Sequence, residues 1–108
     1  KNCQNLSSLS VSGNFRITNL SNIQKLPSLT ELDLSGCKQL TTLALGNISK
    51  SFGNLRLIDI SGCSLIQTEG VVQLAHNCTQ LKSVNMNNCK KVENDGLLAI
   101  SRTLFNLE

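Results

Sequence analysis

The 108-residue sequence predicts one α/β domain, a solenoid in which a parallel sheet and a layer of helices are built from repeated copies of one unit. Leucines recur every 26 residues at Leu29, Leu55, Leu81 and Leu107. Each of the first three begins the same pattern of apolar residues, which leads to a cysteine and which we call the phrase of the repeat. Helical periodicity follows each phrase. We therefore expect about four repeats (1–28, 29–54, 55–80 and 81–106) in a segment of a longer solenoid.

Each phrase contains a short alternating stretch, which predicts a strand with one buried face. These stretches are residues 31–35, 57–61 and 83–87. More than a dozen residues separate successive copies, so the strands are expected to pair in parallel, one per repeat. A similar phrase at Leu6, Leu9, Val11, Asn14 and Ile17 opens a first repeat that is three residues shorter.

The second half of each repeat changes to the i, i+3, i+4, i+7 spacing of a helix. The predicted inner positions are Leu45, Ile48, Ser49 and Phe52, then Val71, Leu74, Ala75 and Cys78, then Leu97, Ile100, Ser101 and Leu104. Thr42, Thr68 and Asn94, with Asn19 in the first repeat, are predicted to cap these helices through their side-chain oxygens. A short or irregular helix is expected before Pro27.

Charged residues at the predicted helix ends suit the helix dipole. Glu69 and Asp95 fall in first turns, whereas Lys50, His76 and Arg102 fall near last turns. We therefore assign the single histidine a helix-end role. Because strands stack about 4.8 Å apart and helices need roughly 8 to 10 Å, the sheet is expected on the concave side of a curved stack.

Three of the five cysteines follow the repeat period, at Cys37, Cys63 and Cys89, with Asn14 in the same place in the first repeat. Where a strand ends, backbone N–H groups are left in a dry interior, at roughly 1 to 3 kcal/mol each, and a small polar side chain can accept their hydrogen bonds. We expect reduced, buried thiols in this role. A zinc site is disfavoured because no C-x2-C spacing occurs.

The stretches from Leu32 to Cys37 and from Ile58 to Cys63 resemble cysteine-containing leucine-rich repeats, such as those of F-box leucine-rich-repeat proteins. The stretches 68–71 and 94–97 resemble the helix openings of the same family. The resemblance implies a right-handed horseshoe segment, with the sheet on the concave face and the helices on the convex face. It implies a protein-binding module, with substrate recognition in a cullin-based ubiquitin ligase as one role and a non-ligase scaffold in an intracellular or ciliary assembly as another. Asn14 and Leu43-Ala44 depart from the family pattern.

The outward positions of the predicted strands form a small grid that we take as the candidate binding surface for a protein partner. Its residues, with the adjoining turns, are Glu31, Asp33, Leu57, Asp59, Asn85, Asn87, Lys38 and Lys90. For the two aspartates, a purely structural strand role competes with a role in binding a basic partner. For Leu57, a role as an aliphatic anchor competes with incidental exposure.

Other function classes lack their sequence signals. No nucleophile and base pattern, H-E-x-x-H motif or phosphate loop supports an enzyme, and no cofactor or metal is expected. The absence of Trp and Tyr and the dispersed basic residues argue against nucleic acid binding, and no apolar run predicts a membrane span. We expect an intracellular protein, cytoplasmic or nuclear. Four Asn-x-Ser/Thr sequons, at Asn5, Asn19, Asn47 and Asn77, keep an extracellular recognition array as the alternative.

Overall fold

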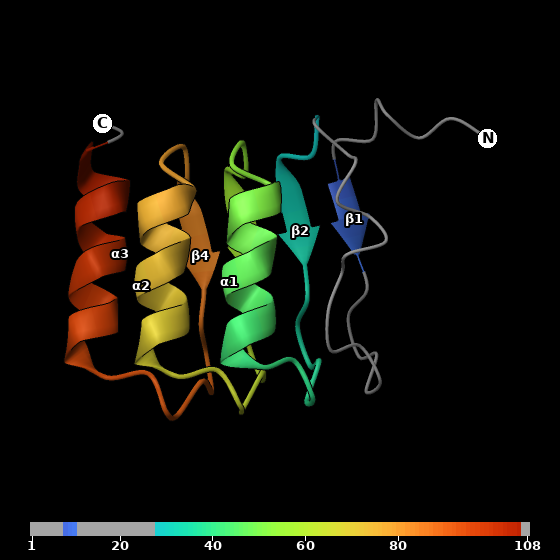
Figure 1. Cartoon of the computed structure of the whole chain (residues 1–108), viewed down its shortest axis with the longest axis vertical. Coiled ribbons are helices and arrows are strands. Elements are labelled where there is room, and N and C mark those ends of the chain that lie inside the picture. Colours follow the sequence, from blue (N-terminus) through green and yellow to red (C-terminus); the bar gives the residue numbers. More distant parts are fainter. Residues whose placement is uncertain (1–7, 11–27, 107–108) are drawn as a thin grey trace.

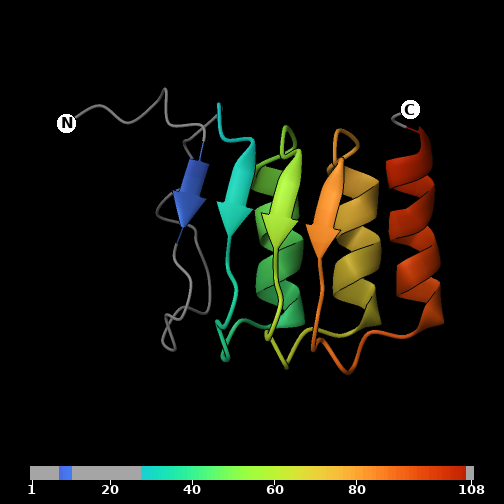
Figure 2. The same cartoon turned by 180° about the vertical axis from the view of Figure 1, so that it is seen from behind.

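The computed structural model describes residues 8–10 and 28–106, which form two layers, a sheet and a row of helices (Figures 1 and 2). The predictions for Leu6, Val11, Asn14, Ile17 and Asn19, and for the helix before Pro27, lie outside these residues. From Glu31 onward, each strand is followed by a helix. The elements are β1 (Ser8–Ser10), β2 (Glu31–Asp33), α1 (Thr42–Ser51), β3 (Leu57–Asp59), α2 (Thr68–Asn77), β4 (Ser83–Asn85) and α3 (Asn94–Asn106).

The four strands form one parallel sheet in the order β1-β2-β3-β4, which confirms the predicted topology. Ile58 lies between Leu32 and Val84, so the pairing between β2, β3 and β4 shifts by one 26-residue period at each step. The strands are three residues long, shorter than the predicted five. Backbone pairing nevertheless continues beyond them, because the Leu34 N–H donates to the Asp59 carbonyl at 2.7 Å.

A left-handed residue ends each pairing region and turns the chain toward the helix layer. Gly36 and Gly62 have φ values of 73° and 75°, and Asn88 takes the same place in the next repeat with a φ of 67°. Only glycine adopts this conformation freely, and asparagine is among the few other residues that tolerate it. The strands therefore end two residues early because the turn begins inside the alternating stretch.

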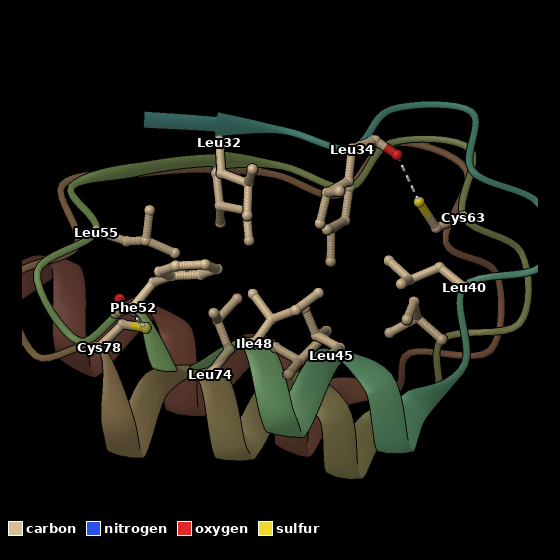
Figure 3. Close-up of a cluster of buried hydrophobic side chains, with 14 of the residues drawn as sticks. Leu32, Leu34, Leu40, Leu45, Ile48, Phe52, Leu55, Cys63, Leu74 and Cys78 are labelled. Atoms are coloured by element: carbon tan, nitrogen blue, oxygen red, sulfur yellow. Dashed lines mark hydrogen bonds between the residues drawn. The ribbon is translucent and has the colours of Figure 1, made fainter. Parts of the chain in front are cut away.

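The core lies between the sheet and the helices and consists of the residues that the two periodicities predicted (Figure 3). Leu32 and Leu34 point from the strand layer toward Leu45 and Ile48 of α1, and all four are at most 2% exposed. The predicted inner positions of α2 are also buried. In the last repeat the equivalent Leu97 is exposed, which departs from the prediction.

The predicted helix caps are shifted by one residue. Thr41, not Thr42, caps α1, and its side chain accepts a hydrogen bond from the Ala44 N–H at 3.1 Å. Gln67 precedes α2 without a side-chain capping bond. Thr42 and Thr68 are the first helical residues, so the assignment of these hydroxyls as caps was wrong.

The hydroxyls of Thr42 and Thr68 instead link successive repeats. Each accepts a hydrogen bond at 2.8 Å from the backbone N–H that precedes the next helix, that of Gln67 or Glu93. A local capping rule cannot find such a contact, because the two partners are 25 residues apart. The two threonines at this position thus contribute to stacking between repeats.

The row of cysteines predicted at Cys37, Cys63 and Cys89 is present. Its main hydrogen bonds run in the opposite direction to the prediction, because the thiols donate instead of accepting. The Cys63 thiol donates to the Leu34 carbonyl at 3.1 Å, and the Cys89 thiol donates to the Ile60 carbonyl at 3.0 Å (Figure 3). Burial raises the pKa of Cys63 to about 12, although a backbone hydrogen bond from Cys37 opposes this shift. The buried group that each thiol satisfies is therefore a carbonyl of the preceding repeat.

Cys78, which was predicted only as an inner position of the helix, also forms hydrogen bonds that the sequence did not suggest. Its thiol donates to the carbonyls of Ser49 and Phe52, at 3.5 and 3.4 Å, where α1 ends. The last carbonyls of a helix lack partners within the helix, so this contact ties α1 to the next repeat. Burial raises the pKa of Cys78 to about 12.

The sheet face as a candidate protein-binding site

The candidate site is the outward surface of the sheet, which we call the sheet face. Period two turns every second strand residue away from the core, and the parallel register places equivalent residues side by side. Glu31, Leu57 and Ser83 form one row across β2, β3 and β4. Asp33, Asp59 and Asn85 form the next row. The predicted grid residues of these strands are thus brought together.

Local hydrogen bonds orient the aspartates of this grid. One oxygen of Asp33, Oδ1, accepts from the Ser35 N–H at 3.0 Å and from the Ser35 hydroxyl at 2.7 Å. Asp59 and Ser61 repeat the arrangement at 2.9 and 2.7 Å. The aspartates therefore have a structural role in closing the turn at the end of each strand, as the D-x-S spacing would allow.

The hydrogen bonds also favour the ionised form of Asp33. The backbone hydrogen bond from Ser35 lowers its pKa most, the Ser35 hydroxyl adds to this effect, and partial burial opposes it. A weaker contribution comes from Ser10 of β1, whose hydroxyl donates to Oδ2 at 3.3 Å. The carboxylate is thus negatively charged at neutral pH.

The second carboxylate oxygen of Asp59 remains available to a partner, whereas that of Asp33 already accepts the Ser10 hydroxyl. Among the described residues, no donor bonds Asp59 Oδ2, and no lysine or arginine forms an ion pair with Glu31, Asp33 or Asp59. Leu57 lies beside these acids with 38% of its surface exposed. The centre of the sheet face therefore combines negative charge with one aliphatic side chain.

Asn85 and Asn87 continue the grid on the last repeat without charge. Asn85 Oδ1 accepts from the Asn87 N–H at 3.1 Å, the same turn contact that Asp33 and Asp59 make. Both asparagines are exposed. An amide can thus replace the aspartate without loss of the backbone bond.

The predicted basic residues Lys38 and Lys90 are exposed in the turns that follow β2 and β4. They are two repeats apart, about 10 Å along the stack at one strand spacing per repeat, so they form no single cationic site.

Sequence reasoning missed a hollow of about 880 Å³ near Lys90 and Lys91, whose lining also includes Glu69, Glu93 and Asp95. Its charges are mixed and come from the first turns of α2 and α3 and from the turn between β4 and α3.

The comparison with known families agrees with this architecture. A family model described as "Leucine Rich repeats (2 copies)" matches residues 4–50, and one described as "Leucine Rich repeat" matches residues 77–101. The chain is built from leucine-rich repeats. No curated protein matches it.

Leucine-rich repeats form protein–protein interaction modules, and the exposed sheet of this chain suits that role. In the described part of the chain, His, Cys, Asp and Glu side chains form no group of three that could hold a metal ion. None of the described helices has the length and apolar character that a bilayer crossing requires.

Proposed function

We propose that the sheet face of this leucine-rich-repeat segment binds an extended stretch of a partner protein that carries basic and aliphatic side chains. The observation that supports this is the group of carboxylates Glu31, Asp33 and Asp59, which have no cation partner among the described residues and lie beside the exposed Leu57. Neighbouring strands hold these side chains at fixed spacing, so little ordering is needed on binding.

The electrostatic contribution follows from the register. Asp33 and Asp59 are direct lateral neighbours. At a strand spacing of about 4.8 Å, their repulsion in water is somewhat under 1 kcal/mol. A lysine or arginine placed between their Oδ2 atoms would remove this repulsion and add two attractions. The acids should therefore contribute mainly specificity and association rate, and Leu57 the apolar contact.

An intracellular location is part of the proposal. Cys63 and Cys89 act as hydrogen-bond donors, and a disulfide would remove the thiol proton that each bond requires. The sequon at Asn77 is also used internally, because Asn77 Nδ2 donates to the buried Ser49 hydroxyl at 3.0 Å. A glycan on this nitrogen would compete with that contact. Both observations favour a reducing compartment over an extracellular array.

Substrate recognition in a cullin-based ubiquitin ligase is the finer role that we propose, and it is supported by the cysteine-type phrases that end at Cys37 and Cys63. A non-ligase scaffold is the alternative, because a solenoid surface serves either role. The sequence of the full-length transcript distinguishes the ligase receptor from the scaffold. An F-box in the same polypeptide supports the ligase receptor, whereas flanking repeats without an adaptor segment support the scaffold.

A displayed peptide library tests the binding surface directly. Peptides selected on the purified chain should be enriched in lysine, arginine and aliphatic residues, and their binding should weaken as salt concentration rises. Leu57→Ser combined with Glu31→Gln should reduce binding. Leu43→Ser is the matched control, because Leu43 is 75% exposed on α1, in the other layer. Selected peptides that lack basic residues, or that bind the sheet-face variant as well as the parent chain, would contradict the proposal.

A further inference from the structure

The sheet face adjoins two cations at the edge of the molecule where helices end and strands begin (Figures 1 and 2). Arg56 and Lys82 are the residues immediately before β3 and β4, and both are exposed. Thr30 holds the equivalent position before β2. Among the described residues, neither Arg56 nor Lys82 forms an ion pair or a side-chain hydrogen bond. We call Arg56 and Lys82 the basic pair.

Backbone hydrogen bonds between repeats fix the spacing of the basic pair. The Arg56 N–H donates to the Thr30 carbonyl at 2.7 Å, and the Lys82 N–H donates to the Arg56 carbonyl at 2.7 Å. The three positions therefore continue the stacking of the strands, about 4.8 Å apart at one strand spacing per repeat. Because their backbone is already ordered, the two cations need little further ordering to bind a ligand.

The helix dipole does not explain the basic pair. Lys50 and His76 lie at the same edge in the last turns of α1 and α2, where positive charge is stabilising. Arg56 and Lys82 lie outside the helices. Two like charges on directly neighbouring positions repel each other, so this placement costs stability that an anionic ligand would restore.

Charge changes sign along the strands of the sheet face. On the third repeat, Arg56 is followed directly by the exposed Leu57 and, two residues later, by Asp59. At about 3.3 Å per residue, the cation and the carboxylate start about 10 Å apart, with the aliphatic side chain between them. Lys38 and Lys90, at the opposite edge, do not border the sheet face in this way, because they follow the turns that lead to the helix layer.

We infer that the partner segment of the sheet face is bipartite in charge, with an acidic part at the basic pair, an aliphatic residue at Leu57 and a basic part at Asp33 and Asp59. The bipartite pattern rests on the proposed function, because it concerns the same partner segment on the same face. A segment that is basic throughout would bring its own cations beside Arg56 and Lys82, and this repulsion selects against it. In an extended segment the acidic and basic parts are about three residues apart.

Two synthetic peptides test the bipartite pattern. The bipartite peptide has the sequence Gly-Glu-Glu-Leu-Ala-Lys-Arg-Gly, and the reference peptide carries glutamine in place of both glutamates. Fluorescence anisotropy at low salt measures the affinity of each peptide for the 108-residue chain. The bipartite peptide should bind at least about threefold more tightly, because it adds two exposed ion pairs. Equal affinities would overturn the inference.

Substitution of the basic pair tests whether these two cations cause the difference. Arg56→Gln combined with Lys82→Gln should abolish the preference for the bipartite peptide. The reference peptide should bind this variant at least as tightly as the parent chain, because a source of repulsion is removed. Lys50→Gln combined with Arg102→Gln is the matched control, since it removes the same charge from exposed residues of α1 and α3, and it should keep the preference. An equal loss of preference in both variants would mean that net charge alone attracts the glutamates, which contradicts the inference.

Leu57→Ser separates failure of the bipartite pattern from failure of the proposed function. Both peptides should bind this variant more weakly than the parent chain. If the reference peptide binds through Leu57 but the glutamates add no affinity, only the bipartite pattern is wrong. If the reference peptide does not bind, or binds Leu57→Ser as well as the parent chain, the proposed function is wrong and the bipartite pattern with it.

Single-stranded oligothymidylate tests the other class of anionic ligand. It should bind the parent chain more weakly than the bipartite peptide does, because no Trp or Tyr is present for base stacking. Tighter binding that is lost in the variant with Arg56→Gln and Lys82→Gln would identify a nucleic acid as the ligand of the basic pair and overturn the inference.

Discussion

Replacement of Ile58 by alanine is the most direct perturbation of the core between repeats. Ile58 is 1% exposed at the centre of β3, between Leu32 and Val84. The change removes three carbon atoms, worth about 2.4 kcal/mol at roughly 0.8 kcal/mol for each buried methylene. The cavity left behind adds to this loss, so we expect a destabilisation of about 3 kcal/mol, within the usual range of 2 to 5.

Urea unfolding followed by circular dichroism measures this loss as a lower midpoint with an unchanged dependence on urea. Leu57→Ala is the matched control, because the adjacent side chain points to the opposite face and is 38% exposed. It should cost under about 1 kcal/mol. Val84→Ala removes two carbons at a partly buried site and should cost roughly 1 kcal/mol. An Ile58→Ala effect below about 1 kcal/mol, or one smaller than that of Leu57→Ala, would refute the assigned register.

Three further changes test the turns, the contacts between repeats and the buried thiols. Gly62→Ala should cost roughly 1 to 2 kcal/mol in urea unfolding, because φ is 75° there, whereas the control Gly53→Ala should stay within about 0.5 kcal/mol. Thr68→Val keeps the side-chain shape but removes the acceptor of a 2.8 Å inter-repeat bond, so calorimetry should show a loss of roughly 0.5 to 1.5 kcal/mol. Burial raises the pKa of Cys63 and Cys78 to about 12 from 9.0, so the unfolded state releases these protons first and stability should fall as pH rises from 9 toward 12. Cys78→Ala should weaken this pH dependence in urea titrations.

A neutral Gly62→Ala would mean that the turn does not require a left-handed residue. A neutral Thr68→Val would mean that water replaces the inter-repeat bond without cost. The chain contains no tyrosine, so tyrosine ionisation cannot imitate the thiol effect. Identical stability at alkaline pH in the parent chain and in Cys78→Ala would show that folding does not protect this thiol from ionisation.

The periodicity of the sequence predicts the fold because burial itself is periodic. Leu32, Ile58 and Val84 recur at the same place in each repeat, and a register slip would move all of them to the polar face. The helical positions of α2 follow from the same argument. The exposure of Leu97 does not, because burial at the end of a stack depends on what covers it rather than on local pattern.

Contacts between repeats were harder to predict than the elements themselves. The hydroxyl of Thr42 resembles a helix cap by its position, yet it bonds the backbone of Gln67. The direction of the Cys63 hydrogen bond depends on which backbone group of Leu34 faces the thiol, and spacing alone does not contain that information. The internal bonds of Asp33 could have been found, because Ser35 follows at the spacing of an Asx turn.

The fold and the proposed binding surface both require that aliphatic side chains point inward from a parallel sheet and leave a polar, acidic face exposed. Side-chain nuclear Overhauser contacts in the folded chain test it most directly. We expect contacts of Ile58 with Leu32 and Val84, and none between Asp59 and the core residue Leu74. Contacts that place Asp59 beside Leu74, or a pattern of antiparallel pairing between β2 and β3, would contradict this arrangement.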